Sequence, residues 1–163
     1  MRLLLPMISA LALLLVGCAS SKVVVVPGDH QSGTSIKKIA VVSDSLLAEN
    51  VGLNLSSLGF FVAPATSGID AMSISSPTQR QALSDAGFDA LLVVRSTDDG
   101  EGRPQNANAL IYSVETGQLV TGVKWENGHG FGIRGSVTNE AMKADQHEAA
   151  EQIAEELAKV IPR

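Results

Sequence analysis

The apolar residues of positions 36–163 recur with periods that predict a series of strands and helices. Residues 36–42 are mostly β-branched and nearly continuous in apolar character, which predicts a strand buried on both faces of a sheet. The spacing of the next apolar residues predicts one face of a helix that ends at Gly59: Leu47, Val51, Leu55 and Leu58. Residues 60–65 then form a short predicted strand, which Pro64 must end or place at an edge.

The second half of the chain continues this alternation. Ser76, Pro77 and Gln79 are typical of a helix start, so a short helix is expected up to Ala86. Residues 89–95 predict a central strand, and two alternating runs at 110–114 and 119–125 predict an antiparallel hairpin. A final helix is expected from about Asn139 to Val160, with an apolar stripe that faces the core: Ala149, Ala150, Ile153, Leu157, Val160 and Ile161.

Together these elements predict the fold class. Their order is β-α-β-α-β-β-β-α, which is typical of an α/β fold, or α+β sandwich, with helices packed on a mixed sheet. We therefore expect residues 36–163 to form a single domain.

The first residues of the chain have a different character. Arg2 is the only charge among residues 1–17, and residues 3–16 form an apolar stretch shorter than the roughly 18 residues that a spanning helix needs. This pattern predicts a signal peptide over residues 1–17. Residues 18–35 are predicted as a flexible tether, within which Val23 to Val26 are either an added edge strand or part of the linker.

Composition and charge narrow the function classes. The chain has 163 residues, 45% of them hydrophobic, with 12 basic and 17 acidic side chains and a formal net charge of −5. The apolar content argues against a disordered chain, and the acidic balance argues against a nucleic-acid partner. Cys18 is the only cysteine, so neither an intrachain disulfide nor a multi-cysteine metal site can form.

Leu15-Val16-Gly17-Cys18, directly after the apolar stretch, resembles the lipobox of bacterial lipoproteins. The resemblance implies that the signal is cut before Cys18, which becomes the acylated N-terminus and anchors the protein to a membrane. Ala19 follows, and the absence of Asp there implies, for a Gram-negative cell, the outer membrane facing the periplasm. The alternative is an ordinary secretory signal with an incidental cysteine.

Four segments of the mature chain carry a second resemblance: residues 38–42 (KIAVV), 58–60 (LGF), 87–94 (GFDALLVV) and 115–120 (ETGQLV). With the predicted element order, they resemble periplasmic α/β domains of the TolB N-terminal type. That group includes the penicillin-binding-protein activator LpoB and the periplasmic domain of the curli secretion lipoprotein CsgG. A CsgG-type pore is disfavoured, since it requires long insertions for membrane hairpins.

Three motifs suggest chemistry, but each lacks an essential part. Residues 130–135 match G-x-G-x-x-G, yet they do not open a βαβ unit. Residues 147–151 nearly form the zinc motif H-E-x-x-H, but Glu151 replaces the second histidine. Asp98, Asp99 and Glu101 lack the spacing of a calcium loop. No G-x-S-x-G motif is present. We therefore predict no catalytic residue, no metal site, no cofactor and no enzymatic activity.

The predicted function is that of an interaction module. The glycine-rich loop 126–135 offers a contact surface for an envelope protein, and its candidate contact residues are Trp125, His129, Phe131 and Arg134. For Trp125 the simpler interpretation is an aromatic residue at the edge of the core. The alternative function is a small-ligand or metal-binding protein, or an enzyme of unrecognised type, if loops 98–103 and 126–135 lie near each other.

Overall fold

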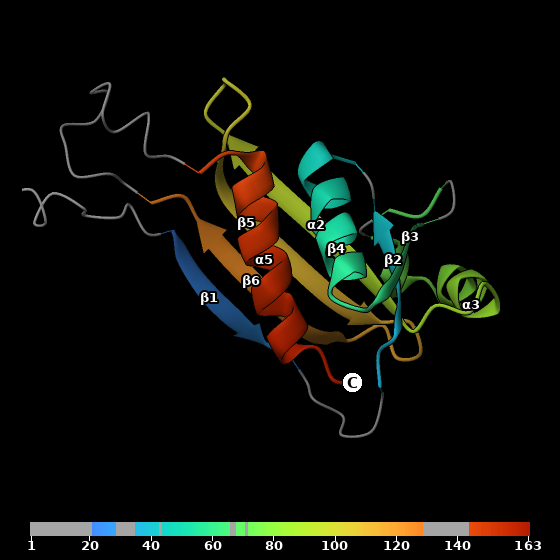
Figure 1. Cartoon of the computed structure of the whole chain (residues 1–163). Helices are drawn as coiled ribbons and strands as arrows, with labels where there is room; N and C mark the ends of the chain where they lie inside the picture. Colours follow the sequence, from blue (N-terminus) through green and yellow to red (C-terminus); the bar gives the residue numbers. More distant parts are fainter. Residues whose placement is uncertain (1–20, 29–34, 43, 66–67, 71, 129–143) are drawn as a thin grey trace, which may run out of the picture.

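A mixed sheet of six strands runs through the computed structural model, which describes residues 21–28, 35–42, 44–65, 68–70, 72–128 and 144–163 (Figure 1). In order across the sheet, the strands are β1 (Lys22–Pro27), β6 (Leu119–Glu126), β5 (Pro104–Ser113), β4 (Ala90–Asp98), β2 (Lys38–Val42) and β3 (Phe61–Pro64). Strand β2 is parallel to β3 and β4, and the other neighbours are antiparallel. The sheet is therefore mixed, as predicted.

The central strands β2 and β4 are buried on both faces. Ile39 and Ala40 point to opposite faces of β2 and are both fully buried, as are Leu91 and Leu92 on β4. A strand with helices on both sides has no solvated face, so its sequence is apolar without alternation. This is why residues 38–42 and 90–94 read as continuous apolar runs.

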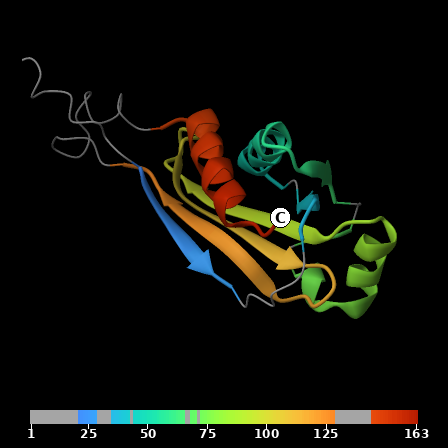
Figure 2. The same ribbon diagram turned by 60° about the horizontal axis from the view of Figure 1, so that its bottom comes forward.

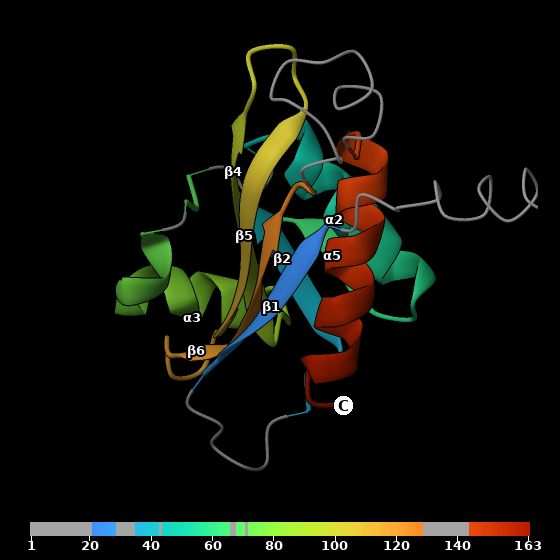
Figure 3. The ribbon, with the colours of Figure 1, turned by 90° about the vertical axis from the view of Figure 1, so that its left-hand side faces the viewer.

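The helices lie on both sides of the sheet. Helices α2 (Leu46–Ser57) and α5 (Gln146–Val160) cover one face, here called the helix face (Figure 3). Helix α3 (Pro77–Asp85) and the short 3-10 helix η1 (Ser73–Ser75) lie at one end of the opposite face (Figure 2). Among the described segments, no helix combines the length and the apolar character that crossing a bilayer requires.

Local hydrogen bonds account for most of the helix ends. The Ser45 hydroxyl accepts a bond from the Ala48 amide at 3.2 Å and caps α2, while Gly59, just beyond its C-terminus, has a φ of +95°. The Asp145 carboxylate accepts bonds from the amides of His147 and Glu148 at 2.8 and 2.9 Å. Ser76 makes no side-chain cap for α3, so that helix start relies on Pro77.

The predicted element order is confirmed from residue 36 onward, but several boundaries differ. Strand β5 begins at Pro104 and not at Leu110. Helix α5 begins at Gln146 with Asp145 as its N-cap, not at about Asn139; residues 139–143 lie outside the described residues. The run Val23–Val26 belongs to β1, where Val23 is opposite Trp125 of β6. Of the two alternatives for this run, the edge strand is the one observed, so the sheet begins well before residue 36.

Candidate functional site

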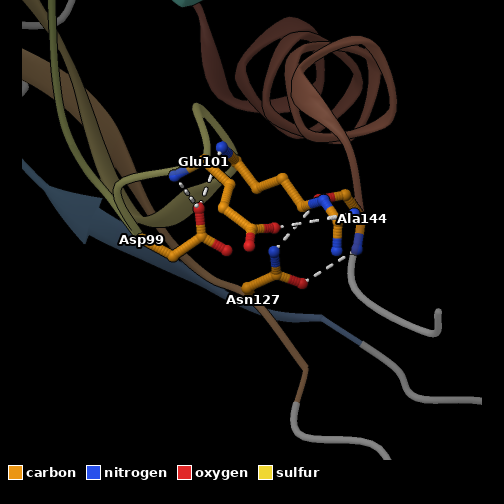
Figure 4. Close-up of polar contacts among 5 residues, drawn as sticks. Asp99, Glu101, Asn127 and Ala144 are labelled. Atoms are coloured by element: carbon orange, nitrogen blue, oxygen red, sulfur yellow. Dashed lines mark hydrogen bonds and ion pairs between the residues drawn. The ribbon is translucent and has the colours of Figure 1, made fainter. Parts of the chain in front are cut away.

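One end of the sheet brings together the segments singled out from the sequence. Lys22 at the start of β1 is opposite Glu126 of β6, Glu126 is opposite Asn106 of β5, and Asn106 is opposite Thr97 of β4. The β4–β5 turn and the first residues of α5 adjoin this row. We call these parts the loop end and define it as residues 21–22, 98–104, 126–128 and 144–146 (Figure 4).

Asn127 holds the loop end together. Its side-chain Nδ2 donates to the Pro104 carbonyl at 2.7 Å. Nδ2 also donates to the Ala144 carbonyl at 3.0 Å, and Oδ1 accepts from the Ala144 amide at 3.0 Å (Figure 4). Its own backbone amide donates to the Gln105 carbonyl at 2.9 Å. A buried amide with donors and acceptor satisfied in this way has a positioning role. It joins the end of β6 to the start of β5 and the approach to α5.

The acidic residues of loop 98–103 form bonds within their own turn. Asp98 Oδ1 accepts from the Gly100 amide at 2.9 Å, and Asp99 Oδ1 accepts from the amides of Glu101 and Arg103 at 3.0 and 3.2 Å. Glu101 lies 4.0 Å from the Arg103 guanidinium. The described residues contain no group of three side chains able to hold a metal ion. These carboxylates thus shape the turn, as side-chain to backbone bonds commonly do.

The described part of loop 126–135 reaches Pro104, the residue directly after loop 98–103. The Gln146 side chain at the start of α5 donates to the Gly102 carbonyl at 2.7 Å, and Asn127 donates to Pro104. Gln146 Oε1 is buried and has no hydrogen-bond partner among the residues that the structure describes. These contacts pack the segments together. The buried side-chain amide of Asn127 already bonds to backbone groups of Pro104 and Ala144.

Trp125 does not lie on a surface available to a partner, which corrects its assignment as a candidate contact. Its side chain is fully buried in the main core, and its Nε1 donates to Gln152 Oε1 of α5 at 2.7 Å. The hydroxyl of Ser21 donates to the same oxygen. Trp125 therefore fixes α5 and the start of β1 to β6. The alternation of apolar and polar residues in 119–125 predicts that Trp125 lies on the apolar face of its strand. Whether that face is fully buried depends on the position of α5, which the sequence pattern does not give.

The other predicted site residues fall outside the part of the chain that the structure describes. These are Cys18 and three residues of the glycine-rich loop: His129, Phe131 and Arg134. The motif 130–135 is outside it as well. His147 and Glu151 are described, and both are exposed on α5. Sequence analysis did not identify Asn127, because its role depends on partners 17 and 23 residues away.

Among the described residues, the one clear pKa shift lies away from the loop end. A hydrogen bond from the Lys159 ammonium to Glu156, 2.6 Å long, together with the charge of Glu156, raises the pKa of Lys159. Both residues are in the last two turns of α5, whereas the loop end adjoins its first turn. This is a surface ion pair and gives no sign of acid-base chemistry.

Comparison with known proteins gives fold-level similarities. No protein-family model matches the chain, and a search of curated proteins finds no match. Among solved structures, it is similar to a variant of the PelC dodecamer from Paraburkholderia phytofirmans, with 14% identity and a TM-score of 0.49 over 88% of this chain and 100% of that one. It is similar to TolB from Acinetobacter baumannii, with 15% identity and a TM-score of 0.46 over 86% of this chain and 31% of TolB.

A third similar structure is the lipoprotein GNA1162 from Neisseria meningitidis, with 21% identity and a TM-score of 0.38 over 60% of this chain and 86% of that one. One of the three is thus a lipoprotein, and another is TolB, whose N-terminal domain type the sequence resembles.

Proposed function

We propose that this chain is a lipoprotein held on an envelope membrane by acylated Cys18, and that its sheet domain is a non-catalytic interaction module that acts close to that membrane. The outer membrane, facing the periplasm, is the proposed location, because Ala19 and not Asp follows the cysteine. The proposed partner is an envelope protein. His129, Phe131 and Arg134 remain proposed contacts within this function.

The observation that carries the proposal is the distance along the chain from Cys18 to the sheet. Strand β1 begins at Lys22, four residues after the lipobox cysteine. An extended chain spans at most about 3.6 Å per residue, so Lys22 lies within roughly 14 Å of the acylated residue. The strand is fixed in the sheet by six residue pairs with β6. We therefore propose that only residues 19–21 separate the acylated cysteine from the sheet, and not the whole segment 18–35.

This spacing determines which part of the domain meets the membrane. Lys22 belongs to the loop end, together with the 98–104 turn and Asn127. An anchor at Cys18 brings the loop end to the lipid surface and points the opposite end, with α3, away from it (Figure 1). A partner that binds the loop end must then present its own site at the membrane surface.

The anchor is tested with Cys18→Ser in the producing cell. A clickable fatty acid fed to the cells should label the wild type and not the variant, and the variant should leave the membrane fraction. Circular dichroism of the purified variant should match the wild type, since Cys18 precedes the first described residue. Equal labelling or equal membrane retention of the two proteins would refute the anchor.

The interaction role is tested by photo-crosslinking in living cells from Glu101, an exposed residue of the loop end. The matched control places the same photoreactive residue at Met72, which is 72% exposed and lies on the face of the sheet opposite the helix face. We expect one crosslinked envelope protein from position 101 and none from position 72. Identical products from both positions, or none from position 101, would contradict a partner site at the loop end.

A further inference from the structure

Both lateral edges of the sheet are unpaired in the described structure. Strand β1 pairs only with β6, and β3 pairs only with β2. Edge strands present backbone amides and carbonyls to other chains, and proteins usually protect them with charges, prolines or covering loops. Here Pro27 ends β1 and Pro64 ends β3, so each edge is short, but the residues between are open.

Exposed large apolar side chains gather at these two edges. Val24 and Val25 of β1 are 45% and 41% exposed. The β3 edge, with the adjacent α2, carries four more: Leu46, Leu53, Leu58 and Phe61. Of the exposed large hydrophobic residues in the described part of the chain, Met72 alone lies elsewhere. Such clustering is typical of an interaction surface and not of scattered surface residues.

We propose that the chain associates with itself, with the β1 edge of one copy docked on the β3 edge of the next. Each copy then offers one edge of each kind, so the contact is heterologous and repeats from copy to copy. This inference does not depend on the acylation of Cys18. It rests on the strand directions and the exposed apolar side chains of the two edges.

Strand direction is the first match. Within one chain β1 is antiparallel to β3, because three antiparallel steps and two parallel steps separate them. A copy that continues the sheet in the same orientation therefore brings β1 antiparallel to β3, the more stable pairing. All copies then keep their loop ends on the same side of the assembly.

The two faces of the edges match as well. Val25 is opposite Val123, a residue of the main core, so it lies on the helix face. The β3 edge offers an open apolar groove of about 440 Å³ on that face, lined by Leu53 and Val62 among others. On the other face, Val24 of one copy would lie beside Phe61, which is 60% exposed. Each exposed valine thus finds an apolar neighbour.

The test is cysteine crosslinking of the full chain in its own membranes with a short bis-maleimide. The double variant Val24→Cys with Phe61→Cys places one thiol on each edge and on the same face of the sheet. We expect a ladder of dimers, trimers and larger species from the double variant on a denaturing gel. Each single variant should give no ladder. Co-expression of the two single variants should give dimers alone.

Matched controls separate this proposal from other outcomes. Val24→Cys combined with Met72→Cys keeps two exposed thiols but moves one away from the β3 edge, and should give no ladder. Dimers from either single variant alone would mean that two identical edges meet. No ladder from the double variant would mean that the β1 and β3 edges do not meet. Either result would overturn the proposal, and so would crosslinking only to a different protein. A crosslinked dimer of the wild type would instead reveal a free Cys18 thiol and refute the anchor.

Discussion

The two faces of the sheet are protected to different degrees. On the helix face, α2 and α5 lie side by side over the strands, and the core there extends from Ile36 to Ile161 (Figure 3). On the opposite face, α3 and η1 cover only one end, where a smaller cluster forms around Leu83 and Leu91. Beyond that cluster Arg95 and Asn108 are exposed.

The difference shows that a single strand can serve an interior and a surface at once. Along β4, Val94 is 1% exposed and points to the helix face, while its neighbour Arg95 is exposed on the other. Successive side chains in a strand alternate between faces. The apolar run of β4 therefore ends with Val94, and the residues from Arg95 to Asp98 are polar and exposed.

The largest expected effect comes from the helix face. Trp125→Ala removes the largest fully buried side chain together with its bond to Gln152, and should lower the free energy of unfolding by about 4 kcal/mol. Because Trp125 is the only tryptophan, unfolding in urea is followed by circular dichroism. The control Trp125→Phe keeps most of the packing and should cost clearly less. A loss below about 1 kcal/mol for Trp125→Ala would contradict its place in the core.

A smaller effect is expected where α3 covers the other face. Leu83 is 1% exposed and packs in the second cluster, so Leu83→Ala should cost about 2 kcal/mol, at the low end for such changes. The reason is that this cluster is small and its neighbours can relax toward solvent. Gln81→Ala, at an exposed position of the same helix, is the control and should change stability by less than about 0.5 kcal/mol. If Leu83→Ala cost as much as Trp125→Ala, the two faces would be equally protected.

Much of this architecture could be predicted from the sequence, because the burial period of each element is local. The apolar runs at 38–42 and 90–94 and the helical spacing of Leu47, Val51 and Leu55 indicate their elements without knowledge of the partners. Turn residues such as Gly59 and Gly117, both with positive φ, mark the boundaries. The α+β fold and the order of its elements therefore follow from residue 36 onward.

The features that could not be predicted depend on partners far away in the chain. Val23–Val26 become a strand because β6 lies about a hundred residues later, and a run of valines has no local signal for its partner. Trp125 is buried because α5 packs over it. Asn127 joins two segments because its side chain bonds to the backbone of Pro104 and Ala144. The sequence thus indicated segments that gather at the loop end, but not which of their residues hold these segments together.

The smallest effect is expected on the part of the second face that α3 and η1 do not cover. Arg95 borders a pocket of about 170 Å³ with Val93, Leu110 and Tyr112, and Arg95→Ala should change the free energy of unfolding by less than about 0.5 kcal/mol. Its neighbour provides the comparison, since Val94→Ala removes buried methyl groups on the helix face and should cost about 2 kcal/mol. Both are measured by urea unfolding under the same conditions. Equal losses from these adjacent residues would mean that a partner segment covers the second face in the intact protein.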